Sequence, residues 1–357
     1  MPERKNFFDF SLESFRGFLC ENGFEKFRAR QIFDAVYRAA IFKVADIPSI
    51  GAPLREFLEN NVEFDAGKLV GSRGSADETG KYLFALADGN FVECVLLKAP
   101  ADDGKIRHTL CISTQVGCAS GCRFCASAMR GFVRNLTAAE IVAQALPFVA
   151  ETLENGKKRR HFLFENIVVM GMGEPLANFD NLIKALAVFN DADKFAFGAR
   201  RITVSTCGLA DKIRELARIK FPFRLAISLH GATDDVRSQI MPINKKFPLG
   251  QVLSAAAEFS AVCGRMITLE YILIKGVNDS FAQANRLAEI AKSLHAHVNL
   301  IPYNAVDGLE WKRPDSSRRK AFADVLERAK VSYTLRREKG SEIDAACGQL
   351  ALKNAKR

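Results

Sequence analysis

The segment that decides the fold is Cys111-Ile-Ser-Thr-Gln-Val-Gly-Cys118-Ala-Ser-Gly-Cys122-Arg-Phe-Cys125. Its last three cysteines have the spacing Cys-x3-Cys-x2-Cys, and an apolar run that is typical of a strand, residues 109–116, leads into them. Gly117 and Gly121 allow the backbone to turn sharply around a bound group. We therefore predict a loop at the end of a strand that holds a metal centre through three thiolates.

The number of thiolates indicates which metal centre this loop binds. Structural zinc usually has four ligands in two separated pairs, and no second pair follows here at the usual distance. A [4Fe–4S] cluster has four irons and is held by cysteine thiolates, so ligation by Cys118, Cys122 and Cys125 would leave one iron open to another ligand. Iron–sulfur clusters and S-adenosylmethionine both occur among the cofactors of radical chemistry. A three-cysteine zinc site and three free thiols are the alternatives.

Composition favours a globular protein of the cytoplasm. The chain has 357 residues, of which 48% are hydrophobic and 26% are charged, enough for one large domain with a smaller addition. No apolar run approaches the ~20 residues needed to span a bilayer, so we expect no membrane segment. The charged N-terminus precedes no signal-peptide core, and nine cysteines in an untargeted chain suggest a reducing compartment.

The net charge of +10 suits a polyanionic partner such as nucleic acid. The basic residues recur in clusters, which either bind phosphates or are ordinary solvated faces. They are Lys26/Arg28/Arg30, Lys157 to Arg160, Lys312/Arg313, Arg318 to Lys320 and Arg336/Arg337.

The first two regions of the chain differ in periodicity. Residues 1–65 have apolar side chains at helical spacing, which predicts a small helical accessory domain that contacts nucleic acid or simply packs. Residues 66–104 contain two strand-like runs joined by the hairpin signal Asp88-Gly89. Strand alternation puts Glu93 between apolar neighbours on one face. It is either a buried acid with a purpose or an edge-strand residue that reaches solvent.

In the third region, residues 105–357, strand-like and amphipathic stretches alternate. This alternation predicts parallel strands with crossover helices, here a partial (β/α)6 barrel of the TIM type within an α/β fold. The strand-like runs are residues 109–116, 167–172, 202–206, 224–229, 266–274 and 298–302. Functional residues of such barrels lie where the strands end and the loops begin.

Small and polar residues follow four of these strands, at the rim where the cysteine loop is expected. They are the segments Met170–Pro175, Val204–Gly208, Ile227–Gly231 and Leu300–Asn304. Each segment alone is a weak signal, and together they predict one site. Near the C-terminus, Cys347 lies among small residues, which by itself fits a core cysteine better than a nucleophile.

The motifs CISTQVGC…CRFC, VVMGMGEPLAN, RITVSTCG, LAISLH, NLIPYN and IDAACGQL together resemble the RlmN family of radical S-adenosylmethionine RNA methyltransferases. The resemblance covers nearly the whole chain. It implies a radical-SAM barrel that methylates C2 of an adenine in 23S ribosomal RNA and in transfer RNA. The sister family Cfr modifies C8 of the same ribosomal adenine, and Val116 and Pro175 are closer to RlmN.

The resemblance also implies a role for each matching residue. Cys347 would carry a methyl group, become a methylene radical that adds to the adenine, and finally form a disulfide with Cys111; Glu93 would accept the proton. A [4Fe–4S] cluster and two molecules of S-adenosylmethionine per turnover would be the cofactors. The cluster ligands would be Cys118, Cys122 and Cys125, and the S-adenosylmethionine contacts Gly173, Glu174, Ser205, Ser228, Leu229, His230 and Asn304. Compared with the family, the segment between Glu93 and Cys111 is longer here.

Two other functions remain open at this stage. One is a radical enzyme that acts on a small molecule or a protein, which would have no need of the thiol pair Cys111 and Cys347. The other is a non-catalytic iron–sulfur or zinc protein that binds RNA. For the methyltransferase we expect a monomer that receives electrons from a donor such as flavodoxin. The remaining cysteines, Cys20, Cys94, Cys207 and Cys263, are expected to have no part in the chemistry.

Overall fold

The computed structural model describes residues 4–64, 66–75, 79–100, 104–154, 157–306, 308–336, 343–346 and 348–350. The helices are α1 (Leu12–Glu21), α2 (Phe27–Phe33), α3 (Ala52–Asn61), α4 (Ala126–Met129), α5 (Ala138–Ala143), α6 (Phe179–Asn190), α7 (Ala210–Arg218), α8 (Asp234–Ile240), α9 (Leu249–Cys263), α10 (Phe281–Ser293) and α11 (Ser316–Arg328). Short 3-10 and π turns supplement them.

The strands are β1 (Lys5–Asn6), β2 (Val62–Glu63), β3 (Lys68–Gly74), β4 (Gly80–Ala85), β5 (Phe91–Pro100), β6 (Ile106–Cys111), β7 (Gln115–Gly117), β8 (Phe132–Asn135), β9 (Val149–Glu154), β10 (Lys157–Phe162), β11 (Asn166–Val169), β12 (Ile202–Thr206), β13 (Arg224–Ser228), β14 (Thr268–Leu273), β15 (His297–Pro302) and β16 (Tyr333–Leu335). In the part of the chain that is described, one 10-stranded sheet runs in the order β16-β15-β14-β13-β12-β11-β6-β5-β4-β3.

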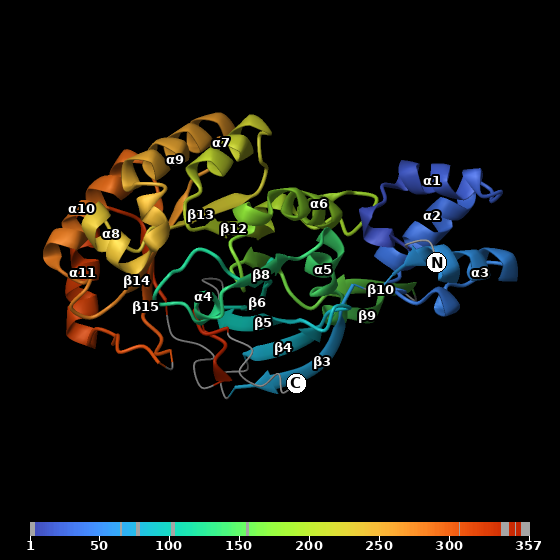
Figure 1. Cartoon of the computed structure of the whole chain (residues 1–357), viewed down its shortest axis with the longest axis horizontal. Coiled ribbons are helices and arrows are strands. Elements are labelled where there is room, and N and C mark those ends of the chain that lie inside the picture. The colour runs from blue at the N-terminus through green and yellow to red at the C-terminus, as the bar shows by residue number, and fades with distance from the viewer. Residues whose placement is uncertain are drawn as a thin grey trace.

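The half of this sheet from β6 to β16 is parallel and forms the predicted partial barrel. Its strands are short, apolar and buried on both faces, as expected where helices cover a parallel sheet. Helices α6, α7, α9, α10 and α11 cover the outer face (Figure 1). Strand β16 extends the barrel by one strand beyond the six that the sequence indicated.

Two local features differ from the sequence prediction, and the predicted hairpin of β4 and β5 is present. The run 109–116 is two elements, because the chain leaves the sheet after Cys111 and β7 pairs instead with β8. The antiparallel hairpin of β9 and β10 lies in a region where the sequence indicated no strand. In the predicted hairpin, β4 and β5 are joined through the three residues Ala87–Gly89, since the Leu86 N–H donates to the Asn90 carbonyl oxygen.

The first helices form a module at one end of the molecule (Figure 1). Its core is aromatic: the Phe7 ring stacks on Phe64 at 4.6 Å and meets Phe15 and Phe33 edge-on at 5.1 Å. Strand β1 pairs with β2 and so joins the start of the module to its end. The Tyr37 ring packs edge-on against Phe195 at 4.9 Å, which fixes the module to the loop after α6.

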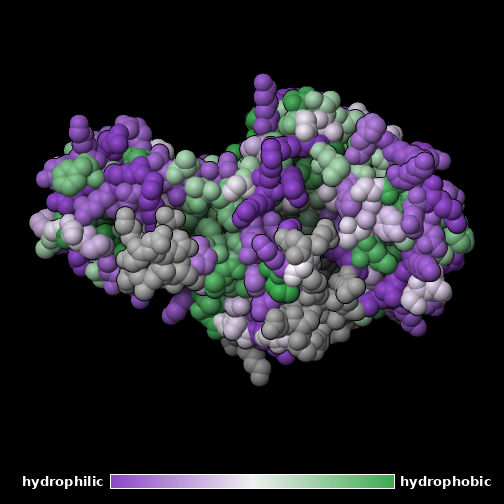
Figure 2. All heavy atoms as spheres, turned by 180° about the vertical axis from the view of Figure 1, so that it is seen from behind, coloured by the Kyte–Doolittle hydropathy of each residue, from purple (hydrophilic) through white to green (hydrophobic). Residues whose placement is uncertain are grey.

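Figure 2 shows hydrophilic side chains over much of this module and over the outer helices, with a hydrophobic strip between them. Among the described residues, none of the helices has both the length and the apolar composition needed to cross a bilayer.

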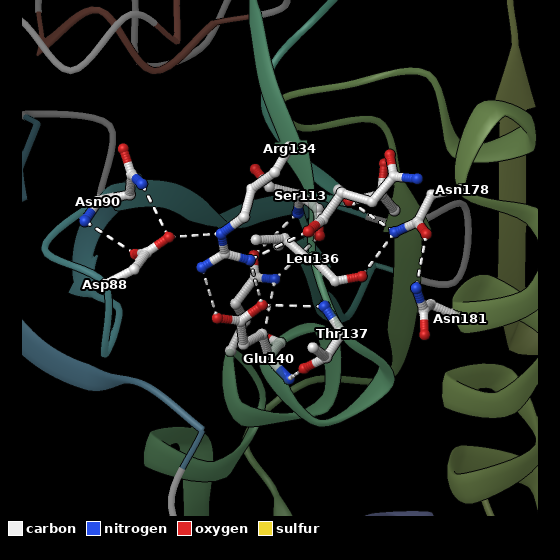
Figure 3. Close-up of polar contacts among 12 residues, drawn as sticks. Asp88, Asn90, Ser113, Arg134, Leu136, Thr137, Glu140, Asn178 and Asn181 are labelled. Atoms are coloured by element: carbon white, nitrogen blue, oxygen red, sulfur yellow. Dashed lines mark hydrogen bonds and ion pairs between the residues drawn. The ribbon is translucent and has the colours of Figure 1, made fainter.

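A polar network around Arg134 of β8 fixes the hairpin against α5 (Figure 3). The guanidinium donates to both oxygens of Glu140 at 2.8 Å and to Asp88 in the hairpin turn. Glu140 in turn accepts from the backbone of Thr137, the residue that caps α5. The hydrogen bond from Arg134 holds the pKa of Asp88 well below its usual range. The network thereby sets where β4 and β5 lie relative to the barrel.

We expect Arg134→Met to lower the free energy of unfolding by about 1–3 kcal/mol, because the Glu140 side chain, only 10% exposed, loses its charged partner. The more exposed Asp88 contributes less. Folding lowers the pKa of Asp88. The contribution of its contact with Arg134 to the free energy of unfolding is therefore complete above about pH 4 and is lost as the pH falls further. Chemical denaturation at pH 7 and at pH 3 measures both effects.

The matched control is Arg16→Met, which removes an exposed ion pair with Glu13 and should cost less than about 0.5 kcal/mol. Equal stability of the two variants at pH 7 would contradict the role given to Arg134.

Candidate active site

The cysteine loop begins directly after β7 and is shaped by glycine. Gly117 has a φ of 74°, and a Cβ there would lie 1.8 Å from the Gly131 carbonyl oxygen, so no other residue fits. That carbonyl accepts the Cys118 N–H at 2.9 Å, and the Cys125 N–H donates to the Cys122 carbonyl at 3.1 Å. The backbone therefore folds around the three thiols.

The three thiols are the candidate ligands of the iron–sulfur cluster that their spacing predicts. Within the described ranges, no three Cys, His, Asp or Glu side chains are arranged to hold one ion. In a [4Fe–4S] cluster each cysteine binds a different iron, so convergence on one point is not required. Burial, with Cys125 and Cys118 close by, raises the pKa of the Cys122 thiol far above its usual value. Cluster binding must therefore release protons from this loop.

Glu174 lies in the loop that follows β11 and joins it to the end of β12. Its carboxylate accepts the Thr206 hydroxyl and the Cys207 N–H at 2.7 Å, and the Leu176 N–H at 3.0 Å. Burial raises the pKa of Glu174, and these donors oppose that shift. Its neighbour Gly173 has a φ of 104°. The glycine and the buried carboxylate together shape the rim beside the cysteine loop.

The serines predicted after β12 and β13 meet inside the barrel. The Ser205 and Ser228 hydroxyl oxygens are 3.4 Å apart. On the same face and in line with Ser228, the Asn299 amide of β15 donates to the Glu270 carboxylate of β14 at 2.7 Å. Predicted residues from separate strands thus share one polar interior. Asn304, after β15, accepts from the Arg313 guanidinium at 3.1 Å.

His230 connects the cysteine loop to the barrel wall. Its φ of 56° is unusual for a side chain of this size, and its Nδ1 accepts the Ile272 N–H at 3.1 Å. Burial, aided by the nearby Arg237 charge, lowers the pKa of His230 to about 3, so the ring is neutral. Its ring meets Phe124 of the cysteine loop edge-on at 4.9 Å. The preceding Leu229 is buried and donates its N–H to the Glu270 carbonyl.

The C-terminal segment lies against the same loop, between α4 and strands β3 to β5 (Figure 1). Cys347 itself is outside the described residues, and its flanks are described. The Gly348 carbonyl accepts the Ala126 N–H at 2.7 Å, and the Leu350 carbonyl accepts the Ser127 hydroxyl at 2.6 Å. These bonds attach the chain around Cys347 to the residues next to Cys125.

Glu93 and Cys111 lie on one face of the sheet. Val95 pairs with Cys111 across β5 and β6, so these two and Glu93 point the same way. The opposite face carries Cys94, whose thiol is 4.0 Å from the Gln144 carbonyl at the end of α5. Glu93 is buried at 4% exposure. This excludes the alternative of an edge-strand glutamate that reaches solvent.

The sequence did not indicate three residues that organise the site. Lys81 of β4 forms an ion pair with Glu93 at 3.1 Å. Arg237, fully buried in α8, donates to the carbonyl oxygens of Cys207 at 2.6 Å and Leu229 at 3.1 Å. Cys207 was expected to have no part in the chemistry. Its N–H donates to the Glu174 carboxylate, and its thiol lies 3.4 Å from the Ser120 hydroxyl. Lys81 lies one residue before the strand-like run that the sequence indicated, residues 82–87, so no signal pointed to it.

The predicted basic clusters differ in the contacts that their side chains make. Arg28 and Arg30 of α2 pair with Glu25 and Asp193, which supports a structural role for this part of the helical module. Arg313 donates to the Tyr303 carbonyl at 2.9 Å, at the rim. Of the other predicted basic residues, Arg337 lies outside the described residues.

Comparison with known proteins agrees with this geometry. The family model Radical SAM superfamily matches residues 112–288. The chain is 53% identical to a protein of Opitutus terrae named "Probable dual-specificity RNA methyltransferase RlmN 3", over 97% of this chain and 94% of that protein. It is 40% identical to "Dual-specificity RNA methyltransferase RlmN" of Syntrophobacter fumaroxidans, over 96% of each chain.

Among solved structures, a radical SAM methyltransferase from Sphaerobacter thermophilus matches with a TM-score of 0.88 and 38% identity. The match covers 97% of this chain and 99% of that one. The helical module, the hairpin and the barrel are therefore all included in the similarity.

The cysteine loop yields a direct prediction. After anaerobic reconstitution with iron and sulfide, the unchanged protein should be brown and contain four irons and four sulfides per cluster. Cys118→Ala should lose most of this visible absorption, because one iron loses its thiolate.

Cys263→Ala is the matched control, since Cys263 ends α9, far along the chain from the cysteine loop, and should leave the iron and sulfide content unchanged. Zinc in place of iron would show that the loop binds another metal. Equal cluster content in both variants would show that Cys118 is not a ligand of the cluster.

Proposed function

This chain belongs to the RlmN family of radical S-adenosylmethionine RNA methyltransferases, and we propose that it methylates C2 of adenine 2503 in 23S ribosomal RNA and of adenine 37 in transfer RNAs. One arrangement carries the proposal: Glu93 and Cys111 share a face of the sheet, and the flanks of Cys347 are held at the cysteine loop beside them. A proton acceptor, a resolving thiol and a carbon carrier thereby belong to one site.

The target atom explains why such a set is needed. C2 of adenine lies between two ring nitrogens and is electron-poor, so it does not attack a methyl sulfonium. The carbon must be delivered to C2 in a reactive form. Cys347, as a thiolate, first takes a methyl group from S-adenosylmethionine by ordinary displacement: its S–CH3 bond forms and the sulfonium C–S bond breaks.

Cys118, Cys122 and Cys125 would hold the [4Fe–4S] cluster. S-adenosylmethionine, two molecules per turnover, would lie at the rim formed by Gly173, Glu174, Ser205, Ser228, Leu229, His230 and Asn304. When bound, the cluster and S-adenosylmethionine supply three things. These are the methyl group, a radical that removes one hydrogen atom from the methyl group on Cys347, and an acceptor for the electron that the RNA adduct releases.

Two residues of this chain then free the product. Glu93 accepts the proton from C2. Cys111 attacks the sulfur of Cys347, so that an S–S bond forms while the S–CH2 bond breaks. The electron pair of the broken bond stays on the carbon, which takes up a proton and becomes the methyl group. The buried position of Cys111 at the end of β6 supports this role, since solvent thiols are kept away from it.

The closest alternative is methylation at C8 of the same adenine, as in the Cfr family. Val116 and Pro175 favour C2, as do the names of the similar proteins. A radical enzyme with a small-molecule or protein substrate would have no use for the two thiols.

Cys111→Ala should accumulate protein covalently bound to RNA, because the adduct forms and cannot be resolved. Denaturing gel electrophoresis with labelled RNA measures it. Cys347→Ala should give neither adduct nor product, since no residue then carries the carbon.

The control is Cys94→Ala, which removes the thiol on the opposite face of the sheet and should turn over without trapping RNA. Trapping in neither Cys111→Ala nor Cys94→Ala would remove the resolving role of Cys111.

Mass spectrometry of the nucleosides from treated RNA distinguishes the two positions. We expect 2-methyladenosine, and 8-methyladenosine would assign the chain to the Cfr type of reaction.

A further inference from the structure

Lys81 is a buried cation to which nothing in the reaction so far gives a task. Its side chain is 5% exposed, as is that of Glu93, and its Nζ lies 3.1 Å from the Glu93 carboxylate. The long and flexible lysine side chain is almost never this buried without a partner. Removing two opposite charges from water is expensive and often contributes no net stability, so such a pair is weak evidence for a purely structural role.

The same ammonium group makes a second contact, to the C-terminal segment. It donates to the carbonyl oxygen of Asp344 at 3.4 Å, three residues before Cys347. One side chain therefore touches both the proposed proton acceptor and the segment that carries the proposed methyl carrier. These two parts of the chain are more than two hundred residues apart in the sequence.

Strand register places the pair on the reacting face. Lys81 is opposite Val95 on β5, and Val95 is opposite Cys111 on β6, so the three side chains form one row across three strands. Glu93 is two residues from Val95 on the same face. The proton acceptor, its cation and the resolving thiol are thus rigidly spaced by one sheet.

We propose that Lys81 is a positioning residue for the release of methylated RNA: it holds the Glu93 carboxylate in place, and it ties the Cys347 segment to that acid. This inference rests on the proposed function of Glu93. In the step concerned, the C2–H bond breaks, its proton goes to the Glu93 carboxylate, and the electron pair stays in the ring. The ammonium group of Lys81, 3.1 Å from that carboxylate, fixes where it lies on the sheet.

The test separates the early and late halves of the reaction. Lys81→Met keeps the length of the side chain and removes the charge. Methylation of Cys347, read by peptide mass spectrometry, should proceed as in the unchanged protein, because the bonds of Gly348 and Leu350 to the cysteine loop remain. Release of methylated RNA should slow by about 10²-fold or more, the usual contribution of a general base, while covalent protein–RNA adduct accumulates.

Two further variants distinguish positioning from folding. Lys81→Arg retains the positive charge and should recover most of the lost rate. Lys68→Met removes an exposed lysine from β3 of the same sheet and should change nothing. Cluster content and thermal midpoint, measured on all variants, report whether the fold is intact.

Combining Lys81→Met with Glu93→Gln completes the design. If Lys81 acts through Glu93, the double variant should be no slower than Glu93→Gln alone, whereas independent effects would multiply. Adduct in Glu93→Gln but not in Lys81→Met would overturn the inference and leave the proposed function standing. If neither variant accumulates the protein–RNA adduct, Glu93 is not the proton acceptor, and the function proposed for this residue is wrong. Equal loss of Cys347 methylation and of release in Lys81→Met would show that the lysine is structural.

Discussion

The continuity of one sheet from the antiparallel hairpin into the parallel barrel is the constraint on which the site depends. Side chains alternate strictly along a strand, and paired residues of neighbouring strands point to the same face. Because β5 pairs with both β4 and β6, the faces of the hairpin and of the barrel are locked together. A shift of one residue in the β5–β6 pairing would turn Glu93 away from Cys111, and a shift in the β4–β5 pairing would turn Lys81 away from Glu93. The Arg134 network, which fixes the hairpin turn against α5, therefore protects the chemistry as well as the fold.

The rim opposite the hairpin contains buried polar groups whose hydrogen-bond partners lie within the chain. Glu174 receives two hydrogen bonds from the end of β12 and one from Leu176 in its own loop, and Arg237 donates to the backbone that follows β12 and β13. An unpaired buried charge costs several kcal/mol, so these groups tolerate few alternative arrangements of the loops around them. The neutral ring of His230 adds a contact to the cysteine loop without adding a charge beside the thiols. The loops of the rim are thus held together by hydrogen bonds and ring contacts within the chain.

The sequence predicted the barrel well because parallel strands buried on both faces are continuous apolar runs, and because working residues follow the ends of such strands. It could not predict the Lys81–Glu93 pair. A two-residue turn at Asp88–Gly89 would pair Ala87 with Asn90 and place these two side chains on opposite faces. The turn has three residues, which shifts the register by one and brings them together. Strand β16 was missed because only three residues, Tyr333–Leu335, pair with β15. Arg237 was missed because most of its partners are backbone carbonyls, which leave no pattern in a sequence, and its one side-chain acceptor among the described contacts is the neutral Asn244.

The two halves of the proposed reaction make different demands on the chain, and the structure divides them accordingly. In the proposed reaction, Glu93 and Cys111 would act on the substrate from β5 and β6, two strands that pair with each other inside one sheet. Cys347 must meet a methyl donor, an adenine and finally Cys111, so its segment cannot be a strand of the same sheet. The described bonds at its flanks include single hydrogen bonds to the short helix α4, to the Ala305 carbonyl oxygen and to Lys81, each contributing about 0.5–1.5 kcal/mol. Such bonds can be exchanged one at a time while the sheet stays intact. The proposed acid and resolving thiol lie in paired strands, whereas the segment of the proposed methyl carrier is attached by contacts that can break one at a time. Several reactions in sequence on one carbon atom require this difference.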